Sequence, residues 1–261
     1  MKSHRFFLPL VILILATIVL CSFGRTLGSY FLEDDIGEVL YVHQIFSGNW
    51  HKVITNFTSN YMEIPTMKVY RPCLLLSIMA DYAVWRTNAS GYFLTNILFL
   101  IGSATLLYML LSELTRSWNR TRSFLFSFFS AILFASSPLH CESVSLMVGR
   151  VDVICAFFFL LSLWTFVRKG DAKNWLLTSL GILSFWIAML VKEMAIALPV
   201  ILPVVVFLFA DLFLKKSKNA GLYTSDQIKP NLQQRMNLVL RISYPICLAA
   251  YFICYSLFCF R

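Results

Sequence analysis

Long apolar runs fill most of the chain, and short polar segments separate them. The first run covers residues 6–23, and a helix of that length crosses about 30 Å of hydrocarbon. Together the runs predict an all-α polytopic membrane protein with about seven transmembrane helices. We place these helices at residues 6–23, 92–111, 123–138, 151–167, 175–191, 194–214 and 242–260.

The polar segment 24–91 is the one region with room for a folded element outside the membrane. Apolar residues recur at helical spacing over 35–46, which predicts an amphipathic interfacial helix that ends at residues 47–50. A second apolar run at 73–85 is too short to span and contains Asp81. We therefore expect a re-entrant or surface-lying helix there.

Composition and charge agree with this topology. Hydrophobic residues make up 59% of the chain and charged residues 13%, which excludes an ordinary soluble domain. The net charge of +9 comes mostly from basic residues in one set of loops, so it indicates orientation and not nucleic-acid binding. We expect one membrane domain over 1–261, with a cytoplasmic N-terminus, an external loop at 24–91 and a cytoplasmic loop at 215–241.

An acidic cluster follows the first predicted span. Only 13 of the 261 residues are Asp or Glu, yet four of them, Glu33, Asp34, Asp35 and Glu38, lie within residues 31–38. Neighbouring carboxylates repel one another, and a fold tolerates this where they meet a cation, a basic partner or a proton to be moved. The alternative is a solvated acidic turn.

Further ionisable residues fall on the same predicted external side. They are Arg71, His140, Glu142, Arg150, Asp152, Lys192 and Glu193. Ionisable groups near membrane depth are costly and usually face a cavity or one another, so together they indicate an active-site mouth. Simpler alternatives are a solvated hairpin tip at 192–193, a local ion pair between Arg150 and Asp152, and a weak metal site at His140 and Glu142.

These residue types suit group transfer from an anionic, lipid-linked donor. A carboxylate at the membrane surface can take the proton of an attacking hydroxyl, and a second carboxylate beside it, as at Asp34 and Asp35, raises its pKa towards a useful range. Arginine and lysine can neutralise the phosphate that leaves. The seven cysteines show no C-x-x-C pair and no metal-type spacing.

Five short motifs, taken in order, resemble those of a known protein family. They are Phe31-Leu32-Glu33-Asp34-Asp35-Ile36, Tyr70-Arg71-Pro72-Cys73-Leu74-Leu75, Ser137-Pro138-Leu139-His140-Cys141-Glu142-Ser143-Val144, Val148-Gly149-Arg150-Val151-Asp152 and Lys192-Glu193. In this order they resemble the transmembrane-and-TPR protein O-mannosyltransferases of the GT-C superfamily and their bacterial relatives. The likeness covers nearly the whole chain.

The resemblance implies a GT-C-like module that moves a sugar from a polyprenyl- or dolichyl-phosphate donor to a hydroxyl group of a protein or lipid. Mannose is the favoured sugar. Asp34 or Asp35 would be the base, and Arg71, Arg150 and Lys192 would hold the donor phosphate. The residues that would shape the site are Glu33, His140, Glu142, Asp152 and Glu193. No residue is assigned to a metal, and a divalent metal cofactor is left open.

Two departures from the family pattern bear on activity. Ser137 stands where the family has histidine, and the chain ends at Arg261 without TPR repeats. We therefore expect a minimal or truncated relative, or acceptor recognition by a partner chain. The competing functions are a transporter or flippase and an inactive scaffold. A transporter should show broken helices in two related halves, and the sequence shows no such symmetry.

The sequence allows two compartments. The short loops and the Lys/Asn-rich segments favour a bacterial inner membrane. An endoplasmic-reticulum membrane is the alternative, and there the sequons at 56–58 and 88–90 would be usable.

Overall fold

The computed structural model describes residues 3–63, 69–116, 118–168 and 175–205. Within these ranges every regular element is a helix, which confirms the predicted all-α class. The α-helices are α1 (Ser3–Phe23), α2 (Glu33–Phe46), α3 (His51–Thr58), α4 (Pro72–Trp85), α5 (Ala89–Leu114), α6 (Arg120–Ala135), α7 (Cys141–Ser145), α8 (Arg150–Arg168) and α9 (Trp175–Val191). The 3-10 helices are η1 (Gly24–Gly28), η2 (Tyr61–Glu63), η3 (Pro138–His140) and η4 (Glu193–Ala197).

Three apolar stretches among the described residues are long enough to cross a membrane: Phe7–Gly28, α5 and α8. α6 together with η3 and α7 makes a fourth candidate, bent by 43° just before Pro138, a residue that has no N–H to continue a helix. α9 has 17 residues, which is short for a span. The predicted span at 194–214 lies outside the described residues from 206 on, and the one at 242–260 lies wholly outside them, so the count of seven stays a prediction.

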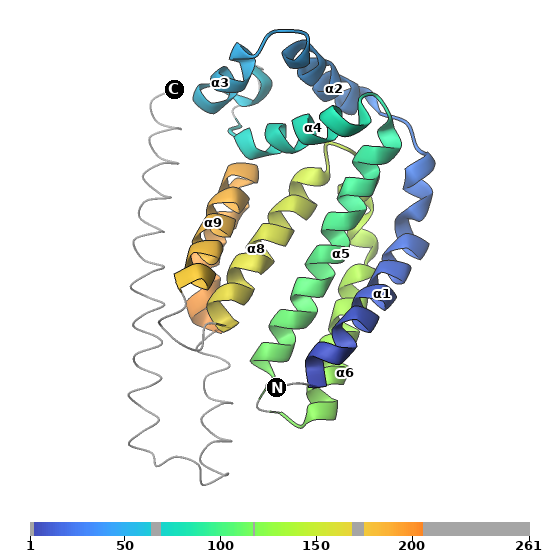
Figure 1. Cartoon of the computed structure of the whole chain (residues 1–261), viewed down its shortest axis with the longest axis vertical. Helices are drawn as coiled ribbons and strands as arrows, with labels where there is room; N and C mark the ends of the chain where they lie inside the picture. Colours follow the sequence, from blue (N-terminus) through green and yellow to red (C-terminus); the bar gives the residue numbers. More distant parts are fainter. Residues whose placement is uncertain (1–2, 64–68, 117, 169–174, 206–261) are drawn as a thin grey trace.

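The long helices form a bundle with α5 at its centre. α8 packs on one side of α5 and α9 packs on α8, while α1 and α6 pack on α5 and on each other (Figure 1). Branched and small side chains fill the contact between α1, α5 and α6. Those that are fully buried include Leu15, Val19, Ile97, Leu100 and Ala131.

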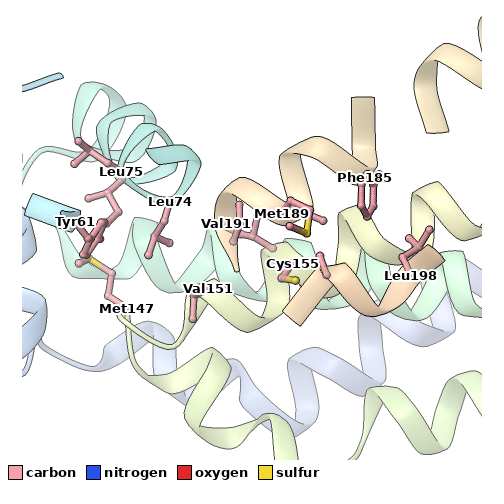
Figure 2. Close-up of a cluster of buried hydrophobic side chains, with 14 of the residues drawn as sticks. Tyr61, Leu74, Leu75, Met147, Val151, Cys155, Phe185, Met189, Val191 and Leu198 are labelled. Carbon is pink, nitrogen blue, oxygen red and sulfur yellow. The ribbon is translucent and has the colours of Figure 1, made fainter. Parts of the chain in front are cut away.

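A second apolar cluster joins α8 and α9 to the shorter helices. In Figure 2, Tyr61, Leu75 and Met147 lie at one end of this cluster, and Phe185 and Leu198 lie at the other. The cluster is therefore continuous from the surface-lying helices down between α8 and α9. Its burial fixes the short helices against the bundle.

α2 and α4 lie across one end of the bundle (Figure 1). The expected surface-lying helix at 73–85 is α4, which begins with Pro72 at its first position. The expected helix at 35–46 is α2, and it ends where predicted. Gly48 has φ +118°, a conformation open to glycine, and the chain turns there before α3, a helix that the apolar pattern did not predict.

Candidate active site

Four of the five motifs meet at the end of the bundle that α2 and α4 cover. We call this the motif end, and define it by Asp34–Asp35 at the start of α2, Arg71 before α4, Arg150–Asp152 at the start of α8, and Lys192–Glu193 after α9. α4 packs on α2, α5 and α9, which brings these four places together (Figure 1).

The two adjacent aspartates have different environments. Asp35 is 1% exposed, and its carboxylate accepts hydrogen bonds from the backbone N–H groups of Leu32 (3.2 Å) and Val148 (3.0 Å). Asp34 is exposed and accepts no hydrogen bond from the part of the chain that the structure describes. Asp35 therefore caps α2 and joins it to the segment before α8, and Asp34 is the carboxylate that a substrate could reach.

Arg150 has an acidic partner that the sequence did not indicate. Its side chain is fully buried, and its Nη2 donates to Asp81 Oδ2 of α4 at 2.5 Å and to the Tyr92 carbonyl oxygen at 3.1 Å. Thr95 donates to the other oxygen of Asp81 at 2.8 Å. The suggested local pair with Asp152 does not form, because residues two apart on a helix do not face each other.

The other basic candidates form two ion pairs side by side. Arg71 Nη2 lies 3.3 Å from Glu193 Oε1, and Lys192 Nζ pairs with Asp152 Oδ1. Since Lys192 and Glu193 are consecutive, the four side chains form one alternating set, which we call the charge row. Its cations are about one-fifth exposed (22% and 18%) and its carboxylates about half exposed (50% and 49%), and Arg71 Nε is buried without a partner.

Glu38, the last member of the acidic cluster, is buried on α2. It accepts a hydrogen bond from Tyr61 at 2.7 Å, and its second oxygen is buried without a partner. Burial raises the pKa of Glu38 from 4.5 to about 7, against the opposing effects of Tyr61 and of the Arg150 charge. Asp35 and Asp34 raise this pKa further. Burial and the neighbouring Glu38 raise the pKa of Tyr61, and the charges of Arg150 and Arg71 oppose that rise.

Sequence reasoning did not single out Glu38 as a site residue, although a signal was present. Glu38 shares the buried face of α2 with Val42 and Ile45, at i+4 and i+7. An acid in the apolar stripe of an amphipathic helix is costly unless it is paired or protonated.

The remaining candidates are not joined to the charge row. The His140 ring packs 4.6 Å from the Phe134 ring, and Glu142 is exposed. Glu142 approaches α8 through its backbone, since a Cβ on Gly149 would lie 2.4 Å from the Glu142 carbonyl oxygen. Of Glu33 the structure gives only that it begins α2.

Among the described residues no group of three His, Cys, Asp or Glu side chains could hold a metal ion. The motif end contains an exposed carboxylate, Asp34, and two partly exposed cations. The cations, Arg71 and Lys192, form ion pairs with the carboxylates of Glu193 and Asp152. Carboxylate and phosphate oxygens are interchangeable partners for such cations. The cations can bind an anionic group, and Asp34 can accept a proton.

The chain is similar in sequence to curated protein O-mannosyl-transferases. It is 28% identical over 217 residues to protein O-mannosyl-transferase TMTC2 of Homo sapiens, covering 81% of this chain and 23% of that protein. It is 30% identical over 187 residues to tmtc2 of Xenopus laevis (66% and 21%), and 29% identical over 153 residues to TMTC1 of Homo sapiens (57% and 17%).

These similarities confirm the resemblance that the five motifs predicted. The chain spans less than a quarter of the length of these relatives. No protein-family model matches the chain, and no solved structure does.

Proposed function

We propose that this chain is a membrane glycosyltransferase that moves a sugar from a polyprenyl- or dolichyl-phosphate donor to a hydroxyl group of a protein or lipid. Mannose is the favoured sugar. The similarity to protein O-mannosyl-transferases supports this class. The observation that carries the proposal is the charge row, whose two cations, Arg71 and Lys192, lie at the ends of apolar helices.

In this proposal Arg71 and Lys192 bind the donor phosphate. Both cations are less exposed than their carboxylate partners, so an incoming phosphate would exchange with Glu193 and Asp152. Arg71 Nε is a buried donor without a partner and supplies one further hydrogen bond. The polyprenyl tail would follow the apolar helix surfaces that begin at the same end.

Asp34 is the proposed general base. The acceptor hydroxyl oxygen attacks the anomeric carbon, the bond from that carbon to the phosphate oxygen breaks, and the electron pair leaves with the lipid phosphate. The hydroxyl proton passes to the Asp34 carboxylate. Asp35 holds the start of α2 and so positions Asp34, and the two cations stabilise the charge that develops on the leaving phosphate.

Acceptor recognition is proposed to involve a partner chain as well. Turnover measured with and without co-purified chains, in the presence of a protein acceptor, tests this part. A divalent metal, if required, would show as activity lost in EDTA and restored by Mg²⁺ or Mn²⁺.

For the compartment, the relatives come from Homo sapiens and Xenopus laevis, which supports the endoplasmic-reticulum membrane over the bacterial inner membrane. The N-terminus would face the cytoplasm and the motif end the lumen. Of the two sequons, the one at 56–58 has a buried asparagine that is inaccessible to glycosylation in the folded chain. Asn56 is 1% exposed and its side chain accepts a hydrogen bond from the Met62 N–H.

The test is donor turnover by the purified chain in lipid vesicles, with radiolabelled polyprenyl-phosphate mannose and then glucose and aminosugar donors. We expect release of polyprenyl phosphate by the unaltered chain, its loss in Asp34→Asn, and a raised KM for the donor in Lys192→Met. Glu113→Gln, which removes a partly exposed carboxylate at the end of α5 that pairs with Arg116, is the matched control.

Retained turnover in Asp34→Asn would overturn the assignment of the base. No turnover of any donor, with acceptor peptides or lipids present, would overturn the stand-alone enzyme. The next experiments would then be reconstitution with co-purified chains and a transport assay in the same vesicles.

A further inference from the structure

The buried ion pair between Arg150 and Asp81 connects three helices. Asp81 lies on α4, Arg150 begins α8, and the pair is completed by Thr95 and the Tyr92 carbonyl oxygen of α5. The Arg150 side chain is fully buried and that of Asp81 is 9% exposed. No other ion pair among the described residues is as enclosed.

Such a pair is a poor source of stability, because both charges lose their hydration when they are buried. Its effect is specificity of arrangement, since α4 can dock in few other positions without leaving Asp81 or Arg150 unpaired. The contact therefore fixes where α4 lies on α5 and α8. The surrounding apolar contacts supply stability but do not select one docking position so sharply.

Both helices joined by the pair carry members of the charge row. Arg71 is the residue from which α4 begins, and Asp152 lies two residues after Arg150 on α8. A shift of α4 by one helical turn, about 5 Å, would separate Arg71 from Glu193. The position of the charge row thus depends on a pair that is itself outside the row.

We propose that Asp81 is a positioning residue, that Arg150 is its counter-ion and does not contact the donor phosphate, and that the pair sets the location of Arg71. The inference rests on the proposed function for the role of Arg71 in donor binding. Two nitrogens of Arg150, Nε and Nη1, lack partners, but both are buried in the interior where α4, α5 and α8 meet around the pair. A phosphate could reach them only by opening that interior.

The experiment compares Asp81→Asn, Arg150→Gln and the double variant in the full chain in lipid. The main measurement does not depend on catalysis: it is the rate at which N-ethylmaleimide labels Cys73, followed by peptide mass spectrometry. Cys73 is a free, partly buried thiol in the first turn of α4, so its labelling reports displacement of that helix. The donor KM is measured in parallel.

The matched control is the exposed pair of Glu113 and Arg116 on and just after α5, neutralised in the same three combinations. Thr95→Val is a milder variant, since it removes one hydrogen bond to Asp81 and keeps the ion pair.

We expect Asp81→Asn to accelerate Cys73 labelling by at least about threefold, because a buried charge is left without its partner and α4 opens more often. The double variant should label Cys73 more slowly than Asp81→Asn, since neither member of the pair is then charged, but faster than the unaltered chain, since the contact that positions α4 is gone. The labelling rate of Cys73 in Thr95→Val should lie between the rates in the unaltered chain and in Asp81→Asn. The control variants of Glu113 and Arg116 should not change the labelling rate.

Two results would overturn the inference. One is labelling in Asp81→Asn no faster than in Glu113→Gln. The other is a double variant with normal labelling and a donor KM raised by about tenfold, which would make Arg150 a phosphate ligand. If the unaltered chain turned over no donor, the proposed function would fail while the labelling comparison still decided the role of the pair.

Discussion

The carboxylate of Asp35 accepts a hydrogen bond from the backbone N–H of Val148, a residue 113 positions later in the chain, at 3.0 Å. The same carboxylate caps the start of α2 through the N–H of Leu32. One buried side chain thus joins the acidic cluster to the segment that leads into α8.

The first prediction concerns the two aspartates. Asp35→Asn should lower the free energy of unfolding by about 1–3 kcal/mol, because the amide nitrogen cannot accept one of the two N–H groups and leaves it unsatisfied. Asp34→Asn should change it by no more than about 0.5 kcal/mol, since Asp34 is exposed. Thermal unfolding in detergent measures both, and equal effects would contradict the division of roles.

The second prediction is a pH dependence carried by Glu38. Its pKa is raised in the folded chain from 4.5 to about 7, so the folded state binds the proton more tightly than the unfolded state. The stability from this group is complete below pH 4.5, falls as the pH rises to about 7, and is level above that. Over this window the loss should be on the order of 3 kcal/mol.

The comparison with Glu38→Gln isolates this effect from Asp34, Asp35 and the other acids. The difference in unfolding free energy between the two chains should vary between pH 4.5 and 7 and be constant above it. Tyr61→Phe should extend the window to higher pH, because the Tyr61 hydrogen bond lowers the pKa of Glu38. A difference independent of pH would show that Glu38 is not buried in this way.

The third prediction concerns the carboxylates of the charge row. Glu193→Gln and Asp152→Asn should change stability by less than about 1 kcal/mol, because both carboxylates are about half exposed. Under the proposed function each should lower the donor KM at low ionic strength, since each removes an anion that competes with phosphate. The effect should shrink above about 0.5 M salt, and a raised KM would instead mean that the carboxylates hold the cations in place.

The fourth prediction uses two glycines. A Cβ on Gly149 would lie 2.4 Å from the Glu142 carbonyl oxygen and 2.9 Å from Ser143 Cα, and backbone atoms cannot yield as a flexible side chain can. Gly149→Ala should therefore destabilise the chain by about 1–3 kcal/mol. Gly37→Ala, on the exposed face of α2 with nothing nearby, should stabilise it by about 0.5–1 kcal/mol. Thermal unfolding of both variants is the measurement.

Much of the fold was readable from the apolar pattern. Period and length gave the all-α class, the positions of α1, α5 and α8, the end of α2 near Gly48, and α4 as a separate short helix. α3 was missed because it is short and polar, and such helices form through tertiary contacts more than through propensity.

The partners within the site were less readable. Arg150 pairs with Asp81, 69 positions away, and Asp152 pairs with Lys192, 40 positions away. Spacing along a chain predicts which residues share a helix face, but it does not say which faces of different helices meet. Lys192 and Glu193 each form an ion pair, so the solvated tip that was the alternative does not occur.

The wide separation of Asp81 and Arg150 in the chain also affects the order in which the helices can assemble during synthesis. Synthesis proceeds from the N-terminus, so α4 leaves the ribosome before α8 exists, and until then Asp81 has no counter-ion. An unpaired acid resists burial among apolar helices. We therefore expect α4 to take its final position only after Arg150 has been synthesised, late in the biogenesis of the bundle.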